Sequence, residues 1–284
     1  MPYTTLISTT DLASNLSTPW VIADCRYDLQ SDEWGHQQYL DSHIPGAVYV
    51  SLSRDLSAPP SGTNGRHPLP SLAALTEMFG RLGIGDGVQV IAYDQDNGMF
   101  ASRLWWMLRF AGHHHVAVLD GGWAKWRAEG RTTRSGTETR DSVPFTARWQ
   151  RDRVIDVEGV STVYQDPGTL LLDARAPERF EGRVEPLDRL PGHIPGAANH
   201  PYRTNLADDN TMLPPETLRT QFTRDLRGHA PAQAIMYCGS GVTACQNLLA
   251  MEHAGLPGAR LYVGSWSEWS ADPARPVETG PSRR

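Results

Sequence analysis

Cysteine, positive charge and long apolar runs are all scarce in this 284-residue sequence. Its three cysteines cannot all pair and make no disulfide framework, which favours free thiols in a reducing compartment such as the cytoplasm. The formal net charge of −6 argues against a nucleic-acid-binding protein, which needs a basic face. No apolar run reaches the length of a membrane span, and residues 1–6 lack the features of a signal peptide. We therefore expect a cytoplasmic protein with no membrane or nucleic-acid partner.

An internal repeat divides the chain, whose length suits two domains that each bury a core. In both halves an aspartate after a short apolar run is followed, at nearly the same separation, by His-Ile-Pro-Gly-Ala. A second apolar run and a tryptophan pair then recur in the same order. The matching landmarks are Asp24 with Asp173, His43 with His193, Asp94 with Cys238, and Trp123 with Trp266. Four landmarks in one order indicate a duplication.

Each copy alternates short apolar runs with longer amphipathic segments. Residues 21–24 and 88–93 are brief, β-branched and bounded by polar or Gly residues, which predicts buried strands. Residues 242–253 have the length and apolar spacing of a helix. This alternation predicts the α/β class, with a mainly parallel sheet flanked by helices in each copy. We place the two domains at residues 1–140 and 151–284, joined by a Thr-, Ser- and Arg-rich stretch.

A glycine-rich turn follows the predicted strand that ends at Tyr237. The order is Cys238, Gly239-Ser240-Gly241, and then a helix near Val242. The glycines let successive backbone N–H groups point inward around an anion, and the helix N-terminus adds its positive dipole. A thiol held there has a depressed pKa, as a nucleophilic cysteine needs. The alternative, a cysteine that only packs at the strand end, needs no such turn.

The first copy has Asp94 at the position of Cys238, followed by Gln95-Asp96-Asn97-Gly98. This loop has no nucleophile and carries negative charge, so we expect that it cannot cradle an anion. The first domain is therefore predicted to be catalytically silent.

The combination of repeat and cysteine loop resembles the two-domain rhodanese-type sulfurtransferases over essentially the whole chain. The shared features are tandem domains with His-Ile-Pro-Gly-Ala, a late Asp-Gly-Gly-Trp-like segment and a cysteine at a strand end. The loop 238–244 is similar to the form typical of 3-mercaptopyruvate sulfurtransferases. Thiosulfate-specific rhodaneses more often have basic residues after the cysteine, where this chain has Gly239 and Ser240.

This resemblance implies two rhodanese-like domains and a ping-pong sulfur transfer. The Cys238 thiolate would take sulfur from 3-mercaptopyruvate, release pyruvate and pass the persulfide sulfur to an acceptor thiol, thioredoxin or cyanide. The backbone of Gly239, Gly241, Val242 and Thr243 would stabilise the sulfur anions without a metal or an organic cofactor.

The resemblance also implies a proton donor, Ser240, whose hydroxyl would help to protonate the leaving enolate. It places a histidine of the first domain's His-Ile-Pro-Gly motif beside this serine, which here is His43. The alternative for His43 is structural, with its ring hydrogen-bonded to backbone. The loop Gly65–Pro68 is a further segment whose approach to the site the sequence leaves open.

A donor carboxylate calls for guanidinium groups, which grip it bidentately. The resemblance places one at Arg179, with a surface salt bridge as the alternative. The second arginine of the family lies in Glu-Pro-Arg, but this chain reads Glu-Pro-Leu-Asp-Arg over residues 185–189. Arg189 is the expected substitute and Arg183 the alternative.

Three other functions fit parts of the pattern. Thiosulfate is the alternative sulfur donor, and the missing Glu-Pro-Arg counts in its favour. A cysteine phosphatase needs an arginine closing the loop, where this chain has Ala244 and Cys245. A non-catalytic persulfide relay needs only the cysteine, and the complete loop with Arg179 favours turnover of a small molecule instead.

The run His113–His115 predicts no metal site, because neighbouring side chains of an extended segment point in opposite directions.

Overall fold

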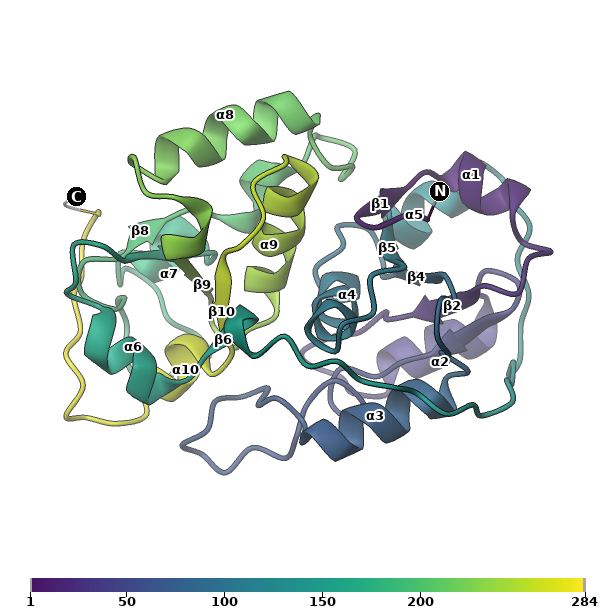
Figure 1. Ribbon diagram of the computed structural model, residues 1–284, viewed down its shortest axis with the longest axis horizontal. Coiled ribbons are helices and arrows are strands. Elements are labelled where there is room, and N and C mark those ends of the chain that lie inside the picture. The colour runs from purple at the N-terminus through teal and green to yellow at the C-terminus, as the bar shows by residue number, and fades with distance from the viewer. Residues whose placement is uncertain (1, 283–284) are drawn as a thin grey trace. The chain divides into compact units, whose positions relative to one another are not determined.

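In the computed structural model, which describes residues 2–282, the chain forms two compact units (Figure 1). The first contains residues 2–58, 70–150 and 208–212, and the second contains residues 59–69, 151–207 and 213–282. The sequence predicted a single break between residues 140 and 151. In the structure, two short segments are exchanged between the units. Segment 59–69 folds with the second unit, and segment 208–212 folds with the first.

The first unit contains a parallel five-stranded sheet in the order β1-β5-β4-β2-β3. Its inner strands are buried along their whole length because helices cover both faces of the sheet, as the continuous apolar runs require. The strands are β1 (Leu6–Ile7), β2 (Val21–Asp24), β3 (Ala47–Tyr49), β4 (Val90–Tyr93) and β5 (Val116–Leu119). The helices are α1 (Thr9–Ser14), α2 (Trp34–Asp41), α3 (Leu72–Arg81), α4 (Ala101–Phe110) and α5 (Gly122–Ala128).

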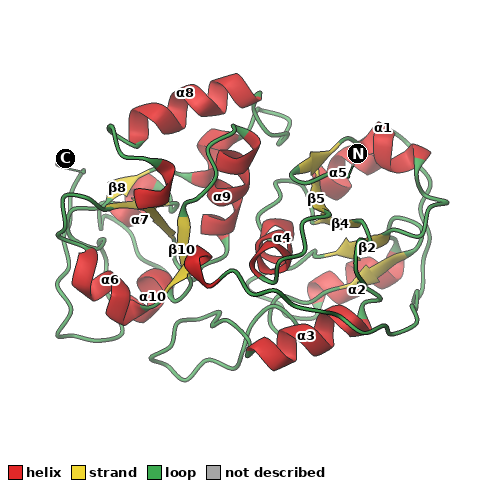
Figure 2. Cartoon of the chain, viewed as in Figure 1, coloured by secondary structure: helices red, strands yellow, loops and turns green. Residues whose placement is uncertain are grey.

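The second unit repeats this topology, with a parallel five-stranded sheet in the order β6-β10-β9-β7-β8. Figure 2 shows the strands of each unit between helices. The strands are β6 (Val154–Ile155), β7 (Leu170–Asp173), β8 (Ala198–Asn199), β9 (Ala234–Tyr237) and β10 (Arg260–Tyr262). The α-helices are α6 (Val157–Val163), α7 (Pro177–Phe180), α8 (Pro215–Asp225), α9 (Thr243–His253) and α10 (Ser265–Trp269). Short 3-10 helices are η1 (Arg151–Arg153), η2 (Tyr202–Asn205) and η3 (Pro231–Gln233).

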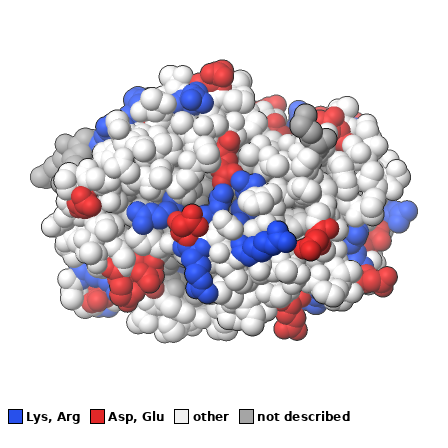
Figure 3. Space-filling model, in the orientation of Figure 1, with Lys and Arg blue, Asp and Glu red and all other residues white. Residues whose placement is uncertain are grey.

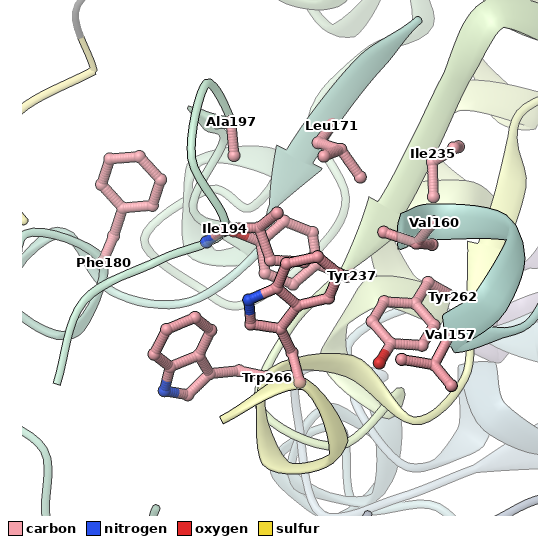
Figure 4. Packing of buried hydrophobic residues seen from close by; sticks show 11 residues of the cluster. Val157, Val160, Leu171, Phe180, Ile194, Ala197, Ile235, Tyr237, Tyr262 and Trp266 are labelled. Atoms are coloured by element: carbon pink, nitrogen blue, oxygen red, sulfur yellow. Dashed lines mark hydrogen bonds between the residues drawn. The ribbon is translucent and has the colours of Figure 1, made fainter. Parts of the chain in front are cut away.

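The core of the second unit fixes β9 from both sides. Helix α9 packs on β9 and β10 on one face of the sheet. On the other face, residues of α6 and α10 pack on β7 and β9 around Tyr237 and the fully buried Trp266 (Figure 4). The Trp266 indole N–H donates to the Leu190 carbonyl at 2.8 Å, which satisfies its one polar atom. Truncating such a buried aromatic costs about 3–5 kcal/mol, so the end of β9 is held rigidly.

The repeated aspartate and histidine hold an equivalent turn in each unit. In the second unit Asp173 pairs with Arg175 at 2.6 Å, and Arg175 donates to the Gly192 carbonyl at 2.7 Å. His193 then stacks on Phe180, with its Nδ1 2.7 Å from the Phe180 carbonyl. The corresponding interactions in the first unit join Arg26 to Asp24 and to the Ser42 carbonyl.

No helix among residues 2–282 is long and apolar enough to span a membrane.

Candidate active site

Cys238 lies at the carboxyl end of β9, the central strand of its sheet, and is 2 % exposed. The first turn of α10 holds the backbone of Cys238 at the start of the glycine-rich loop. The Cys238 N–H donates to Oγ of Ser265 at 3.1 Å, and the Trp266 N–H donates to the Cys238 carbonyl at 2.9 Å. Gly241 has φ of 75°, a conformation that favours glycine, and its N–H points to Sγ of Cys238 at 3.2 Å. The glycine turn therefore places a backbone donor on the sulfur.

The surroundings of Cys238 lower the pKa of its thiol below the ordinary value. Burial acts in the opposite direction, but hydrogen bonds from the Thr243 hydroxyl and from the N–H groups of Ala244 and Ser240 outweigh it. Cys25, which follows β2, shows the contrast. Burial first, and then the negative charge of Asp24, raise the pKa of its thiol well above the usual range. Of these two buried thiols, only Cys238 has the environment of a nucleophile.

The matching loop of the first unit holds the carboxylate of its own Asp94. Oδ1 accepts from the Gly98 N–H at 2.9 Å, and Oδ2 accepts from Phe100 at 2.7 Å and Ala101 at 3.1 Å. Burial raises the pKa of Asp94 to about 6, against the lowering effect of these donors. The backbone donors of this loop do converge on an anion, but that anion is the carboxylate of the chain's own Asp94. That the loop cannot cradle a ligand anion stays a prediction.

Ser240 lies beside a histidine from the exchanged segment 59–69. Nδ1 of His67 is 2.8 Å from Oγ of Ser240, which is 6 % exposed. The segment is anchored at its neighbouring residues: Gly65 packs against the Gly264 backbone, and the Arg66 N–H donates to Oγ of Ser267 at 3.0 Å.

The structure places His43 in a different environment from the one predicted. Its side chain is fully buried in the first unit, stacked on Tyr39, with its Nδ1 2.7 Å from the Tyr39 carbonyl. His67 therefore replaces His43 as the candidate partner of Ser240. The sequence offered only a weak signal for it, a Gly-Arg-His-Pro loop far from Ser240 along the chain.

Two guanidinium groups face Gly239, the residue after the cysteine. A Cβ atom built on Gly239 would lie 2.8 Å from Nη2 of Arg66 and 3.5 Å from Nη1 of Arg179. Burial and the neighbouring positive charge of Arg179 lower the pKa of Arg66. Arg179, which α7 carries, was predicted as a substrate-binding residue, whereas Arg66 was not. Their arrangement supplies N–H donors for an anion beside Gly239, the residue that follows Cys238.

Arg189 and Arg183, the substitutes considered for the missing Glu-Pro-Arg, lie elsewhere. Arg189 is exposed and donates to the Ala271 carbonyl at 3.4 Å. Arg183 is exposed and pairs with Glu181 at 2.7 Å. Arg66 thus takes the position at the loop that Arg189 was expected to fill.

No group of three or more His, Cys, Asp and Glu residues within 2–282 is placed to hold a metal ion. In the histidine run, Nε2 of His113 lies 2.8 Å from the Val88 carbonyl, and Nδ1 of His115 lies 2.9 Å from the Gly87 carbonyl. On the face drawn in Figure 3, Lys and Arg side chains form small groups with Asp and Glu among them.

A model of the rhodanese-like domain matches this chain twice, over residues 8–129 and 157–272. The chain belongs to the rhodanese family. Both matches lie on the repeated topology described above, so the prediction of two tandem rhodanese-like α/β domains is confirmed.

Relatives of this rhodanese chain have names that refer to two sulfur donors. A Pseudomonas aeruginosa protein named as a 3-mercaptopyruvate sulfurtransferase is 44% identical, over 97% of this chain and 98% of its own. A Mycobacterium tuberculosis protein named as a thiosulfate sulfurtransferase is 40% identical, over 97% of both chains. Among solved structures, the 3-mercaptopyruvate sulfurtransferase of Leishmania major matches 94% of this chain and 74% of its own, with a TM-score of 0.83 and 31% identity. SseA of Escherichia coli, named as a 3-mercaptopyruvate sulfotransferase, matches 94% of this chain and 100% of its own, with a TM-score of 0.78 and 33% identity.

Proposed function

We propose that this protein is a sulfurtransferase that moves a sulfane sulfur from 3-mercaptopyruvate to a thiol or cyanide through a persulfide on Cys238. One observation carries the proposal. A thiol of lowered pKa lies in a ring of donors, with a Ser-His pair on one side and two guanidinium groups beside the next residue. This set supplies a nucleophile, a proton path and a carboxylate clamp within one unit.

In the first half-reaction the Cys238 thiolate attacks the donor's sulfur. The carbon–sulfur bond breaks, its electron pair goes to the enolate of pyruvate, and Cys238 becomes a persulfide. The thiol proton of the donor ends on the methyl carbon of pyruvate, so atoms and charge balance. Ser240 and His67 provide the path for that proton, since the hydroxyl and imidazole are already in hydrogen-bond contact.

The loop stabilises negative charge on sulfur before and after this step. The Gly241 N–H and the donors from Ser240, Thr243 and Ala244 surround the thiolate, and the same preorganised groups serve the terminal sulfur of the persulfide anion. In the second half-reaction an acceptor thiol, such as that of thioredoxin, or cyanide removes this sulfur and restores the thiolate. The three cysteines are free thiols, which persist in a reducing compartment such as the cytoplasm.

The Arg66 and Arg179 guanidinium groups orient the donor by its carboxylate. Arg66 Nη2 and Arg179 Nη1 lie beside Gly239, so a carboxylate held there leaves the rest of the donor next to Cys238. Guanidinium suits this task because its planar N–H groups match a carboxylate bidentately.

Thiosulfate is the second candidate donor, and the name of the Mycobacterium tuberculosis relative favours it. Its reaction releases sulfite and needs no proton on carbon, so the Ser240–His67 pair would have no task there. The neutral residues Gly239 and Ser240 also give a dianion no added positive charge. These two features favour 3-mercaptopyruvate.

Initial rates with 3-mercaptopyruvate and with thiosulfate, each with cyanide as the acceptor, test the proposal. We expect the wild-type kcat/KM to be at least tenfold higher with 3-mercaptopyruvate, and Cys238→Ser to be inactive with both donors. Higher efficiency with thiosulfate would overturn the donor assignment alone. Activity that persists in Cys238→Ser would overturn the persulfide mechanism.

A further inference from the structure

A short acidic turn, residues 185–188, lies behind the two guanidinium groups of the candidate site. The Glu185 side chain closes this turn, because its Oε1 accepts from the backbone N–H groups of Leu187 and Asp188, each at 3.1 Å. The side chains of Glu185 and Asp188 are only 3 % and 2 % exposed. Buried carboxylates fixed in this way are built into the site and do not sample solvent.

Asp188 bridges both arginines. Oδ2 accepts from Nη2 of Arg179 at 3.0 Å, and Oδ1 accepts from Nη1 of Arg66. Arg179 Nη1 and Arg66 Nη2 lie beside Gly239, as does Arg179 Nη2, but these first two nitrogens donate to neither Glu185 nor Asp188. Neither has a hydrogen-bond acceptor among the residues that the structure describes. Asp188 therefore orients both guanidinium groups while leaving Arg179 Nη1 and Arg66 Nη2 available for a donor anion, and it also cancels part of their charge.

The charges of this cluster are evenly matched. Its guanidinium groups are linked through shared carboxylates, with Glu185 accepting from both Arg175 and Arg179. The members are Arg66, Arg175 and Arg179 on the positive side and Asp173, Glu185 and Asp188 on the negative side. With the Cys238 thiolate added, the free site carries a net negative charge, which disfavours each further negative charge on the donor.

We propose that Asp188 determines the choice of sulfur donor: by bridging Arg66 and Arg179 it sets the site to accept a monoanionic carboxylate donor and to reject a dianionic one. This assignment rests on the proposed sulfurtransferase function. Thiosulfate brings two negative charges to the guanidinium groups, whereas the carboxylate of 3-mercaptopyruvate brings one. Removing the Asp188 charge leaves Arg179 paired with Glu185 and gives the cluster one more unit of positive charge, which favours thiosulfate more than 3-mercaptopyruvate.

The test is donor preference in Asp188→Asn, which keeps the shape of the side chain and one acceptor oxygen. Glu181→Gln is the matched control. It also removes one carboxylate from the second unit, but Glu181 pairs with the exposed Arg183 and not with Arg66 or Arg179. We expect the ratio of kcat/KM for thiosulfate to that for 3-mercaptopyruvate to rise at least tenfold in Asp188→Asn, about 1.4 kcal/mol of discrimination. The ratio in Glu181→Gln should stay within twofold of wild type.

An equal loss with both donors in Asp188→Asn would mean that Asp188 only supports the fold, and it would overturn the assignment. A matching rise in Glu181→Gln would also overturn it, since any added positive charge would then suffice. A wild-type protein inactive with both donors would overturn the proposed function, and this assignment with it.

If Asp188→Asn does not fold, the assignment can be tested by comparing two inhibitors of the wild-type protein. Pyruvate, a monoanion, should inhibit turnover of 3-mercaptopyruvate at a lower concentration than sulfate, a dianion. The reverse order would overturn the assignment.

Discussion

Replacing Gly239 with alanine tests the arrangement of the donor site with a single methyl group. Gly239 is not in the left-handed region of φ, so alanine meets no backbone penalty there. The new Cβ would lie 2.8 Å from Nη2 of Arg66, which is too close, and 3.5 Å from Arg179, which is an ordinary contact. Because a guanidinium is the far end of a flexible side chain, we expect Arg66 to move while the loop stays in place.

The size of the effect follows from what Arg66 provides. One charge-assisted hydrogen bond to a carboxylate contributes about 1.5–3 kcal/mol, so Gly239→Ala should lower kcat/KM for 3-mercaptopyruvate by roughly 10- to 150-fold. We expect most of this as a higher KM, since the nucleophile and its donors are unchanged. Steady-state kinetics measure the loss in kcat/KM, and the thermal unfolding midpoint shows whether the loop keeps its stability.

Two results would contradict the expected displacement of Arg66. An unchanged kcat/KM in a folded Gly239→Ala protein would show that Arg66 does not hold the donor. A large loss of stability would show that the loop backbone, and not Arg66, had to yield. Gly241→Ala is the comparison, because its φ of 75° makes alanine strained there and should lower the unfolding midpoint as well.

Three further predictions concern protons. His67→Ala should lower kcat with 3-mercaptopyruvate about 100-fold but leave thiosulfate turnover within threefold, because only the first donor needs a proton on carbon; equal losses would exclude a proton path through His67. Thr243→Val should shift the pH midpoint of alkylation of Cys238 upward, since it removes a hydrogen bond that lowers the pKa of that thiol, and an unchanged midpoint would contradict this. Burial opposes ionisation of Asp225, but hydrogen bonds, first from His200, lower its pKa to about 2. This carboxylate therefore adds about 2 kcal/mol of stability above pH 4 that is lost as pH falls toward 2, and Asp225→Asn should flatten this part of a denaturation-versus-pH curve.

The sequence predicted those features that depend on local pattern. Residues 21–24 and 242–253 coincide closely with β2 and α9, because apolar periodicity and flanking Gly residues decide such elements. The repeat predicted the shared topology, and the Gly-Ser-Gly turn after Cys238 predicted the donors around its sulfur.

The features that the sequence could not provide depend on contacts between distant segments. Segment 59–69 has no periodicity that would assign it to the second unit, yet it brings His67 to Ser240 and Arg66 to Gly239. Arg189 was predicted because it is the arginine that ends the altered Glu-Pro-Leu-Asp-Arg segment. Proximity along the chain was misleading there, because the side chain of Asp188 faces the arginines while that of Arg189 is exposed.

The carboxylate of Asp94 in the first unit has a consequence for how such a duplicated enzyme can change. A loop whose N–H groups converge on one point needs a negative group there, since buried donors without an acceptor cost about 1–3 kcal/mol each. A neutral apolar residue at position 94 would leave these donors without an acceptor and destabilise the turn, whereas the Asp94 carboxylate satisfies them. The turn therefore keeps its donors satisfied without a sulfur for as long as the Asp94 carboxylate is ionised. By the same requirement the sulfur of Cys238 supports the fold of its loop as well as the chemistry, and removing it, as in Cys238→Ala, should lower the stability of the second unit.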